Sequence, residues 1–188
     1  VYQLSKLNGE LLAHRLARQT GVPLAVIRPT AIFGPGDMRL LKLFKLANRW
    51  LAAFPGNGEI RYHLVYVDDL VDAFILASEH EAAVGESFII GADECLTLNQ
   101  LINLMGACLG RHPKKIHLPA LPFQMAGNLC EGIFGMLGME PPIYRRRVDF
   151  FTKSRSFNTR KAKEMLGFAP KVTLKLGIEK TAEWYVLN

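Results

Sequence analysis

The sequence has few of the residues that bind zinc or form disulfides. Its three cysteines, Cys95, Cys108 and Cys130, are widely spaced and form no Cys-x-x-Cys pair. This spacing argues against a structural zinc site and against a disulfide framework. We therefore expect a reducing, cytoplasmic environment for the protein.

Long hydrophobic runs are also lacking. The most apolar stretch, residues 122–139, is interrupted by Gln124, Asn128, Glu131 and four glycines. It barely reaches the length of a bilayer-spanning helix. We expect a buried or interfacial helix here and no membrane span, with lipid contact as the alternative. Internal repeats and low-complexity tracts are absent from the sequence.

The composition is that of a globular protein. A chain of 188 residues with 49% apolar content can bury one sizeable core, or parts of two. Its net charge of +6 would suit an anionic ligand, nucleic acid or an acidic surface.

The first part of the chain has the pattern of an α/β protein. Apolar residues recur every three or four positions over residues 2–19, which predicts a helix that ends before Gly21 and Pro23. Residues 24–27 are continuously apolar, which is typical of a strand buried on both faces of a parallel sheet. A helix, a short turn and a buried strand form half of a βαβ unit.

The remaining elements follow from the same periodicity. Asp68 or Asp69 is expected to cap a helix rather than to bind a metal, since nothing nearby completes a metal site. Thr97 and Gln100 form a capping-box pattern at the start of another helix. The sequence predicts helices over residues 38–53, 97–109, 159–166 and 173–187, and strands over residues 63–67, 87–91 and 115–119.

Tyr2 and Lys6 are the strongest candidates for chemistry. They stand four residues apart, so both side chains leave the same face of the predicted helix. A phenol exchanges protons poorly at neutral pH unless a nearby cation favours the phenolate, and Lys6 is placed to be that cation. The pair can act as a general acid/base on an alcohol or ketone. The motif is short enough to arise by chance, and it needs support from other parts of the chain.

That support comes from three further motifs. Residues 27–37 read Ile-Arg-Pro-Thr-Ala-Ile-Phe-Gly-Pro-Gly-Asp, residues 65–69 read Val-Tyr-Val-Asp-Asp, and residues 158–162 read Asn-Thr-Arg-Lys-Ala. In this order, with Tyr-x-x-Ser-Lys at the start, they resemble the extended short-chain dehydrogenase/reductase family, the NAD-dependent epimerase/dehydratase group. In that family the Gly-rich dinucleotide loop lies upstream of the tyrosine. The resemblance therefore implies that this chain is the C-terminal part only, without the N-terminal Rossmann half.

The resemblance implies an α/β fold: the C-terminal part of a Rossmann-like parallel sheet plus a small, mostly helical substrate domain. Residues 1–34 and 60–91 would belong to the dinucleotide-binding domain. Residues 35–59 and 92–157 would form the substrate-binding lid, and residues 158–188 the C-terminal helices.

The resemblance also implies an enzyme that uses NAD or NADP to transfer hydride at a secondary alcohol or ketone. Tyr2 would exchange the hydroxyl proton, and Lys6 would lower the pKa of the tyrosine and bind the nicotinamide ribose. Pro29 and Ile32 would approach the nicotinamide. The family implies a homodimer for the full-length protein and a small-molecule substrate. We expect no metal and no nucleic acid partner, and we expect the present chain alone to be inactive and to lack tight cofactor binding.

Two substrate classes stay open. Many nucleotide-sugar members of the family carry Asn where this chain has Ala31 and Arg where it has Tyr62, which favours a sterol-like or flavonoid-like alcohol as substrate. Arg145 to Arg147 form a dense basic run that can bind phosphate, with Arg145 and Arg147 as candidate contacts to a sugar nucleotide. The alternative to an enzyme is a non-catalytic relative that senses the cofactor or binds RNA, against which the intact Tyr2 and Lys6 argue.

Overall fold

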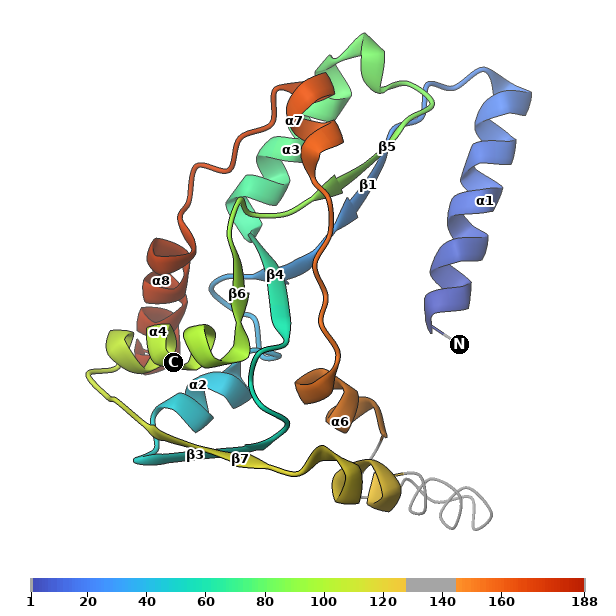
Figure 1. Ribbon diagram of the computed structural model, residues 1–188. Coiled ribbons are helices and arrows are strands. Elements are labelled where there is room, and N and C mark those ends of the chain that lie inside the picture. Colours follow the sequence, from blue (N-terminus) through green and yellow to red (C-terminus); the bar gives the residue numbers. More distant parts are fainter. Residues whose placement is uncertain (1, 128–144, 188) are drawn as a thin grey trace. The chain divides into compact units, whose positions relative to one another are not determined.

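The computed structural model describes residues 2–127 and 145–187 (Figure 1). Within these ranges the side chains of Tyr2, residues 145–147 and Leu187 are not described. The elements in chain order are α1 (Tyr2–Thr20), β1 (Val26–Pro29), β2 (Ala31–Phe33), α2 (Leu41–Ala47), β3 (Leu51–Pro55), β4 (Arg61–Tyr66), α3 (Val67–Glu79), the 3₁₀ turn η1 (Glu81–Ala83), β5 (Ser87–Ile90), β6 (Cys95–Thr97), α4 (Leu98–Cys108), β7 (Lys114–Leu118), α6 (Arg145–Thr152), α7 (Arg160–Leu166) and α8 (Leu174–Leu187).

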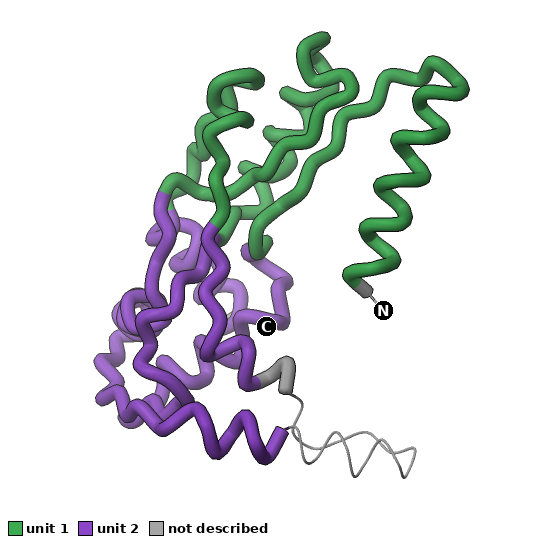
Figure 2. The backbone as a smooth tube through the Cα atoms, turned by 45° about the vertical axis from the view of Figure 1, so that its right-hand side comes forward, with its two compact units in different colours: residues 1–32, 64–93, 157–173 green, residues 33–63, 94–156, 174–188 purple. Residues whose placement is uncertain are grey.

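The chain folds into two compact units, coloured separately in Figure 2. Unit 1 contains residues 1–32, 64–93 and 157–173, and unit 2 contains residues 33–63, 94–156 and 174–188. Each unit is therefore assembled from three separate segments, so the connections between segments run back and forth between the units.

Unit 1 is built on a parallel strand pair. β1 pairs with β5 in parallel, from Val26 opposite Ser87 to Pro29 opposite Ile90. Helices α3 and α7 contribute apolar side chains that pack with β5 into a fully buried cluster. Its largest members are Leu70, Phe88, Ile90, Leu166 and Phe168.

The strand predicted after the first helix is confirmed: it is β1, and it pairs in parallel. The expectation that both faces of this strand are buried is wrong. Val26 and Ile27 are half-buried, and Arg28 and Pro29 are exposed. Among the described residues β1 has one strand neighbour, β5. The leucines of α1 are also exposed, at 48% to 64% of their surface. Burial of this apolar stripe is therefore not achieved within the described part of the chain.

Unit 2 combines one parallel and one antiparallel strand pair with the helices α2, α4, α6 and α8. β3 pairs with β7 in parallel, from Leu51 opposite Lys114 to Pro55 opposite Leu118, and β4 pairs with β6 antiparallel, from Arg61 opposite Thr97 to His63 opposite Cys95. Helix α4 packs on α2 and on α8. The predicted capping box of α4 is confirmed: the Thr97 side chain accepts from the Gln100 N–H, and the Gln100 side chain accepts from the Thr97 N–H. The parallel pairs and their helices confirm the α/β fold class.

The helix expected over residues 38–53 is wrong in its second half. Helix α2 ends at Ala47, and Leu51–Pro55 is the strand β3. Burial alternates along these five residues, with Ala52 and Phe54 buried between more exposed neighbours. This is the period of a strand, and pairing with β7 stabilises it.

The two aspartates at the start of α3 do not cap it. The residue that precedes the helix is Tyr66, and no side chain makes a capping hydrogen bond there. Asp69 is buried and instead accepts backbone hydrogen bonds from Lys171 and Val172. The carboxylates in the first turn still face the positive end of the helix dipole, which favours this placement.

The apolar stretch predicted as a helix over residues 122–139 is helical as far as residue 127, and the rest of it lies outside the described residues. Within the ranges that the structure describes, no helix combines the length and the hydrophobicity that a membrane crossing requires.

Candidate active site

The candidate acid/base pair lies at the start of α1. Tyr2 is the first residue of the helix, and Lys6, whose side chain is exposed, follows one turn later. Glu10 follows after one further turn, so the three positions lie roughly along one face of α1. The position of the Tyr2 hydroxyl is outside what the structure describes.

An ion pair joins this face of α1 to the end of β1. Arg28 donates from Nε to Glu10 Oε2 at 3.1 Å and from Nη2 to Glu10 Oε1. The hydrogen bond from Arg28 lowers the pKa of Glu10 and correspondingly raises the pKa of Arg28. A forked guanidinium–carboxylate pair restricts both side chains. It therefore holds the carboxyl end of β1 against the face that carries Lys6.

The end of β1 is where α/β sheets place their ligands. Pro29 is exposed there, and Ile32 is half-buried against the unit 1 core. Between them, Thr30 is buried, its N–H donates to the Ile90 carbonyl, and its hydroxyl has no hydrogen-bond partner among the described residues. A buried hydroxyl without a partner is costly unless a ligand or water satisfies it. The Thr30 hydroxyl could therefore form a hydrogen bond with a polar group of a ligand bound at the end of β1.

Sequence reasoning missed both Glu10 and Thr30. Glu10 was detectable, because it continues the four-residue spacing of Tyr2 and Lys6 along one helical face. Thr30 stands beside the predicted contact Pro29, but only the folded structure shows that its hydroxyl is buried and unsatisfied.

Tyr62 lies in β4 of unit 2 and is almost fully buried, at 4% exposure. Its hydroxyl donates to the backbone carbonyl of Phe150, and its ring lies 5.2 Å from the Phe150 ring. Burial raises the pKa of Tyr62 far above its ordinary value. In this arrangement the phenol is a neutral hydrogen-bond donor to the protein itself.

The remaining predicted contacts, Arg145 and Arg147, belong to the first turn of α6 in unit 2, and their side chains lie outside the described residues. Tyr2, Lys6, Pro29 and Ile32 all belong to unit 1. Four of the predicted site residues thus belong to unit 1 and the other three to unit 2. Among the residues described, no cluster of acidic, His and Cys side chains suited to a metal ion occurs.

A comparison with protein families finds a match in the first half of the chain. The model of the NAD dependent epimerase/dehydratase family matches residues 1–91, which run from α1 to the end of β5 and include residues of both units. Over these residues the chain belongs to the NAD-dependent epimerase/dehydratase family. The resemblance to the extended short-chain dehydrogenases/reductases is thereby confirmed.

Relatives with known activities come from two substrate groups. The chain is 30% identical to a 3beta-hydroxysteroid-dehydrogenase/decarboxylase of Arabidopsis thaliana, over 97% of this chain and 45% of that protein. It is 32% identical to the decarboxylating sterol-4-alpha-carboxylate 3-dehydrogenase of Saccharomyces cerevisiae, over 84% of this chain and 48% of that protein. A UDP-glucose 4-epimerase of Thermotoga maritima, solved with UDP-glucose, has a similar fold, with a TM-score of 0.69, 27% identity, and coverage of 99% of this chain and 53% of that one. The chain spans about half the length of the curated relatives it matches.

Proposed function

We propose that this chain is the C-terminal part of an NAD(P)-dependent oxidoreductase that transfers hydride at a secondary alcohol or ketone. Tyr2 is the general acid/base that gives or takes the hydroxyl proton. Lys6, one turn away on the same helical face, lowers the pKa of Tyr2 and binds the nicotinamide ribose. The observation that carries this proposal is the Arg28–Glu10 pair, which links the face of α1 that carries Lys6 to the carboxyl end of β1.

The residues at the end of β1 suit the nicotinamide end of the cofactor. When bound, NAD(P) supplies the hydride acceptor or donor, and the protein supplies position and charge. Pro29 and Ile32 offer an apolar surface for a ring, and the unsatisfied Thr30 hydroxyl can bond to a polar group beside it. NAD is the first choice because the family that matches residues 1–91 is NAD dependent.

For the substrate, we propose the secondary alcohol of a sterol-like ring system. Two of the relatives act on sterols by their names, and this chain is more similar in sequence to each of them, at 30% and 32% identity, than to the nucleotide-sugar epimerase, at 27%. Tyr62 also supports this choice: it stands where many nucleotide-sugar members of the family carry Arg, and its hydroxyl donates to the Phe150 carbonyl.

A nucleotide sugar is the second candidate substrate. The fold shared with the UDP-glucose-bound epimerase and the basic residues Arg145 and Arg147 favour it. A non-catalytic protein that senses the cofactor or binds RNA is the remaining alternative, and it gives no reason for the Tyr2–Lys6 spacing. For the whole protein we further propose a cytoplasmic homodimer.

Replacement of Tyr2 by Phe tests the acid/base role in the full-length protein that contains this chain. We expect kcat to fall by about 100-fold or more, while NAD binding measured by calorimetry stays nearly unchanged. Gln3→Ala is a matched control, because Gln3 is exposed on α1 but lies off the Tyr2–Lys6–Glu10 face. Unchanged turnover of Tyr2→Phe would disprove the assignment.

The substrate is tested by an assay of the same protein with secondary sterol alcohols and with UDP-sugars. Turnover of the sterols alone supports the first choice, and turnover of the UDP-sugars alone overturns it. Salt-dependent RNA binding without any turnover, unchanged in Tyr2→Phe, would support the non-catalytic alternative. For residues 1–188 alone, we expect no tight NAD or NADP binding by calorimetry.

A further inference from the structure

A cavity lies in unit 2, and none of the candidate active-site residues line it. It has a volume of about 360 Å³, and its walls come from the turn between α2 and β3 and the turn between α4 and β7. The residues that give it its character are Arg49, Trp50, Arg111, His112 and Lys114. The site therefore combines several cationic side chains with one large aromatic ring.

The two turns are held together by backbone contacts. The Lys114 N–H donates to the Trp50 carbonyl at 2.9 Å, which starts the parallel β3–β7 pairing. The Arg111 N–H donates to the Gly106 carbonyl at 2.8 Å. A Cβ on Gly106 would meet the Arg111 carbonyl at 2.8 Å, so this close approach requires glycine. The cationic residues are thus placed by ordered secondary structure and not by free loops.

The cavity is unusual in its lack of acidic neighbours along the chain. Residues 38–58 and 95–130 contain no Asp or Glu at all. Elsewhere the described lysines commonly pair with carboxylates, as Lys161 does with Glu86 and Lys171 with Asp72. Arg49, Arg111 and Lys114 form no such ion pair with any described residue. Their positive charge is therefore available to a ligand.

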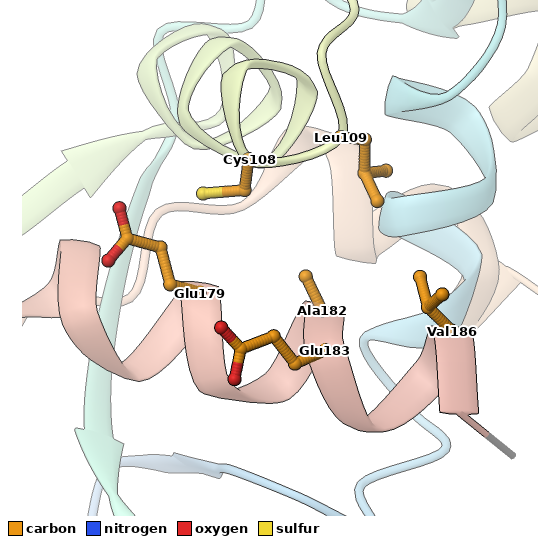
Figure 3. Close-up of a pocket in the computed structure, with 6 residues that line it drawn as sticks. All are labelled: Cys108, Leu109, Glu179, Ala182, Glu183 and Val186. Atoms are coloured by element: carbon orange, nitrogen blue, oxygen red, sulfur yellow. The ribbon is translucent and has the colours of Figure 1, made fainter.

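Acidic side chains do lie on α8, but they line a different cavity. There Glu179 and Glu183 line the cavity from α8, and Cys108 and Leu109 line it from the end of α4 (Figure 3). The two cavities share no lining residue, so these carboxylates are not part of the cationic cavity.

Trp50 is 77% exposed, more than any other large apolar side chain in the described part of the chain. It contributes nothing to the core of unit 2, yet it presents an indole ring beside the arginines. An exposed indole can stack on a flat ring or cover an apolar group, and arginines bind phosphate through forked hydrogen bonds. The combination is therefore suited to a ligand with both features.

We propose that this cavity binds a phosphate group, with the ring or apolar body next to that phosphate lying on Trp50. Arg49, Arg111 and Lys114 neutralise the phosphate. The same chemistry is offered by a soluble mononucleotide and by an anionic phospholipid headgroup, and the experiment distinguishes these two sources. The proposal does not depend on the proposed oxidoreductase activity, because it uses none of the same residues.

Trp50 provides the readout. The chain has two tryptophans, and Trp184→Phe leaves Trp50 as the sole tryptophan, whose fluorescence can be excited selectively at wavelengths where tyrosine does not absorb. In this background, Trp50 fluorescence is titrated with inorganic phosphate, with 5′-AMP, and with vesicles of phosphatidylcholine containing or lacking phosphatidylglycerol. We expect saturable changes with 5′-AMP or with the anionic vesicles, and tighter binding than for inorganic phosphate. Saturation by 5′-AMP alone identifies a soluble ligand, and saturation by the anionic vesicles alone identifies a headgroup.

The double variant Arg49→Gln/Arg111→Gln should weaken this binding by about tenfold or more. Lys42→Gln/Lys45→Gln is the matched control, because it removes the same charge from exposed positions of α2 that do not line the cavity. Unchanged urea-unfolding midpoints verify that both variants fold. Absence of any Trp50 response up to about 10 mM ligand, or equal weakening in the two double variants, would overturn the proposal.

Discussion

The buried carboxylate of Asp69 accepts a hydrogen bond of 2.8 Å from the backbone N–H of Lys171, 102 residues further along the chain. The Val172 N–H adds longer bonds of 3.3 Å to both carboxylate oxygens. One turn along α3, Asp72 pairs with the Lys171 side chain at 2.7 Å. The start of α3 is thereby tied to the segment that follows α7, and both belong to unit 1.

Replacement of Asp69 by Ala should destabilise unit 1. The change leaves the partly buried backbone N–H groups of Lys171 and Val172 without their acceptor, which costs about 1–3 kcal/mol in the free energy of unfolding. Urea unfolding followed by circular dichroism measures this loss. Asp68→Ala is the control, because Asp68 is exposed, occupies the same turn of α3 and carries the same charge. An equal loss in the two variants would show that the helix dipole, and not the link to Lys171, sets the stability.

This link shows which features of the fold the sequence could not predict. The Asp-Asp pair before an apolar periodic segment is typical of a helix cap, and local pattern alone favours that interpretation. The Asp69 carboxylate instead accepts hydrogen bonds from the backbone N–H groups of Lys171 and Val172, which lie far along the chain. The prediction of a helix over the residues of β3 was wrong for the same reason. Leu51–Pro55 continues an apolar helical segment in the sequence, and its strand conformation depends on pairing with β7.

Features set by local sequence were predicted correctly. The Thr97–Gln100 capping box needs only residues three apart, and it forms as expected. The β5 strand likewise follows from its short apolar run between turns. For the candidate site, the spacing of Tyr2 and Lys6 is a local property of one helix. The Arg28–Glu10 contact and the unsatisfied Thr30 hydroxyl depend on tertiary packing, so no sequence pattern encodes them directly.

The Arg28–Glu10 pair should make a small, pH-dependent contribution to stability. Because folding lowers the pKa of Glu10, the contribution is fully present above the pKa of an unfolded Glu, about 4.3, and is lost as the pH falls through the folded value. A double-mutant cycle with Glu10→Gln and Arg28→Gln near neutral pH should give a coupling of about 0.2–1 kcal/mol, since Arg28 is half exposed. The coupling should shrink in acid. A coupling that is independent of pH would contradict an ionic origin.

Tyr185 should make the protein sensitive to alkali. Its hydroxyl donates to the Asp37 carbonyl, and burial, with a smaller effect from the Asp37 charge, raises the pKa of Tyr185 to about 12. The folded state thus favours the neutral phenol. Its contribution is complete below the unfolded tyrosine pKa of about 10 and is lost as the pH rises through about 12.

The variant Tyr185→Phe tests this pH dependence. It should lower the free energy of unfolding by about 0.5–1.5 kcal/mol near neutral pH, because one hydrogen bond is lost. It should also reduce the further decline of stability above about pH 10, measured by urea unfolding over a pH series. Part of the alkaline loss of stability should remain in the variant, because burial raises the pKa of Tyr62 as well. A decline of unchanged size in Tyr185→Phe would show that other groups cause it.

Cys108 should react slowly with alkylating reagents, and Glu179 should be one cause. Burial raises the pKa of the Cys108 thiol, and the nearby Glu179 carboxylate raises it further, so less thiolate is present near pH 8. In a Cys95→Ser/Cys130→Ser background, Glu179→Gln should accelerate iodoacetamide labelling of Cys108 by roughly threefold, because the repelling charge is removed. Glu183→Gln is the matched control: Glu183 lines the same cavity, but it is not among the groups that shift this pKa (Figure 3). If both variants accelerated labelling equally, with unchanged unfolding midpoints, the slow reaction would reflect access to the sulfur and not its charge state.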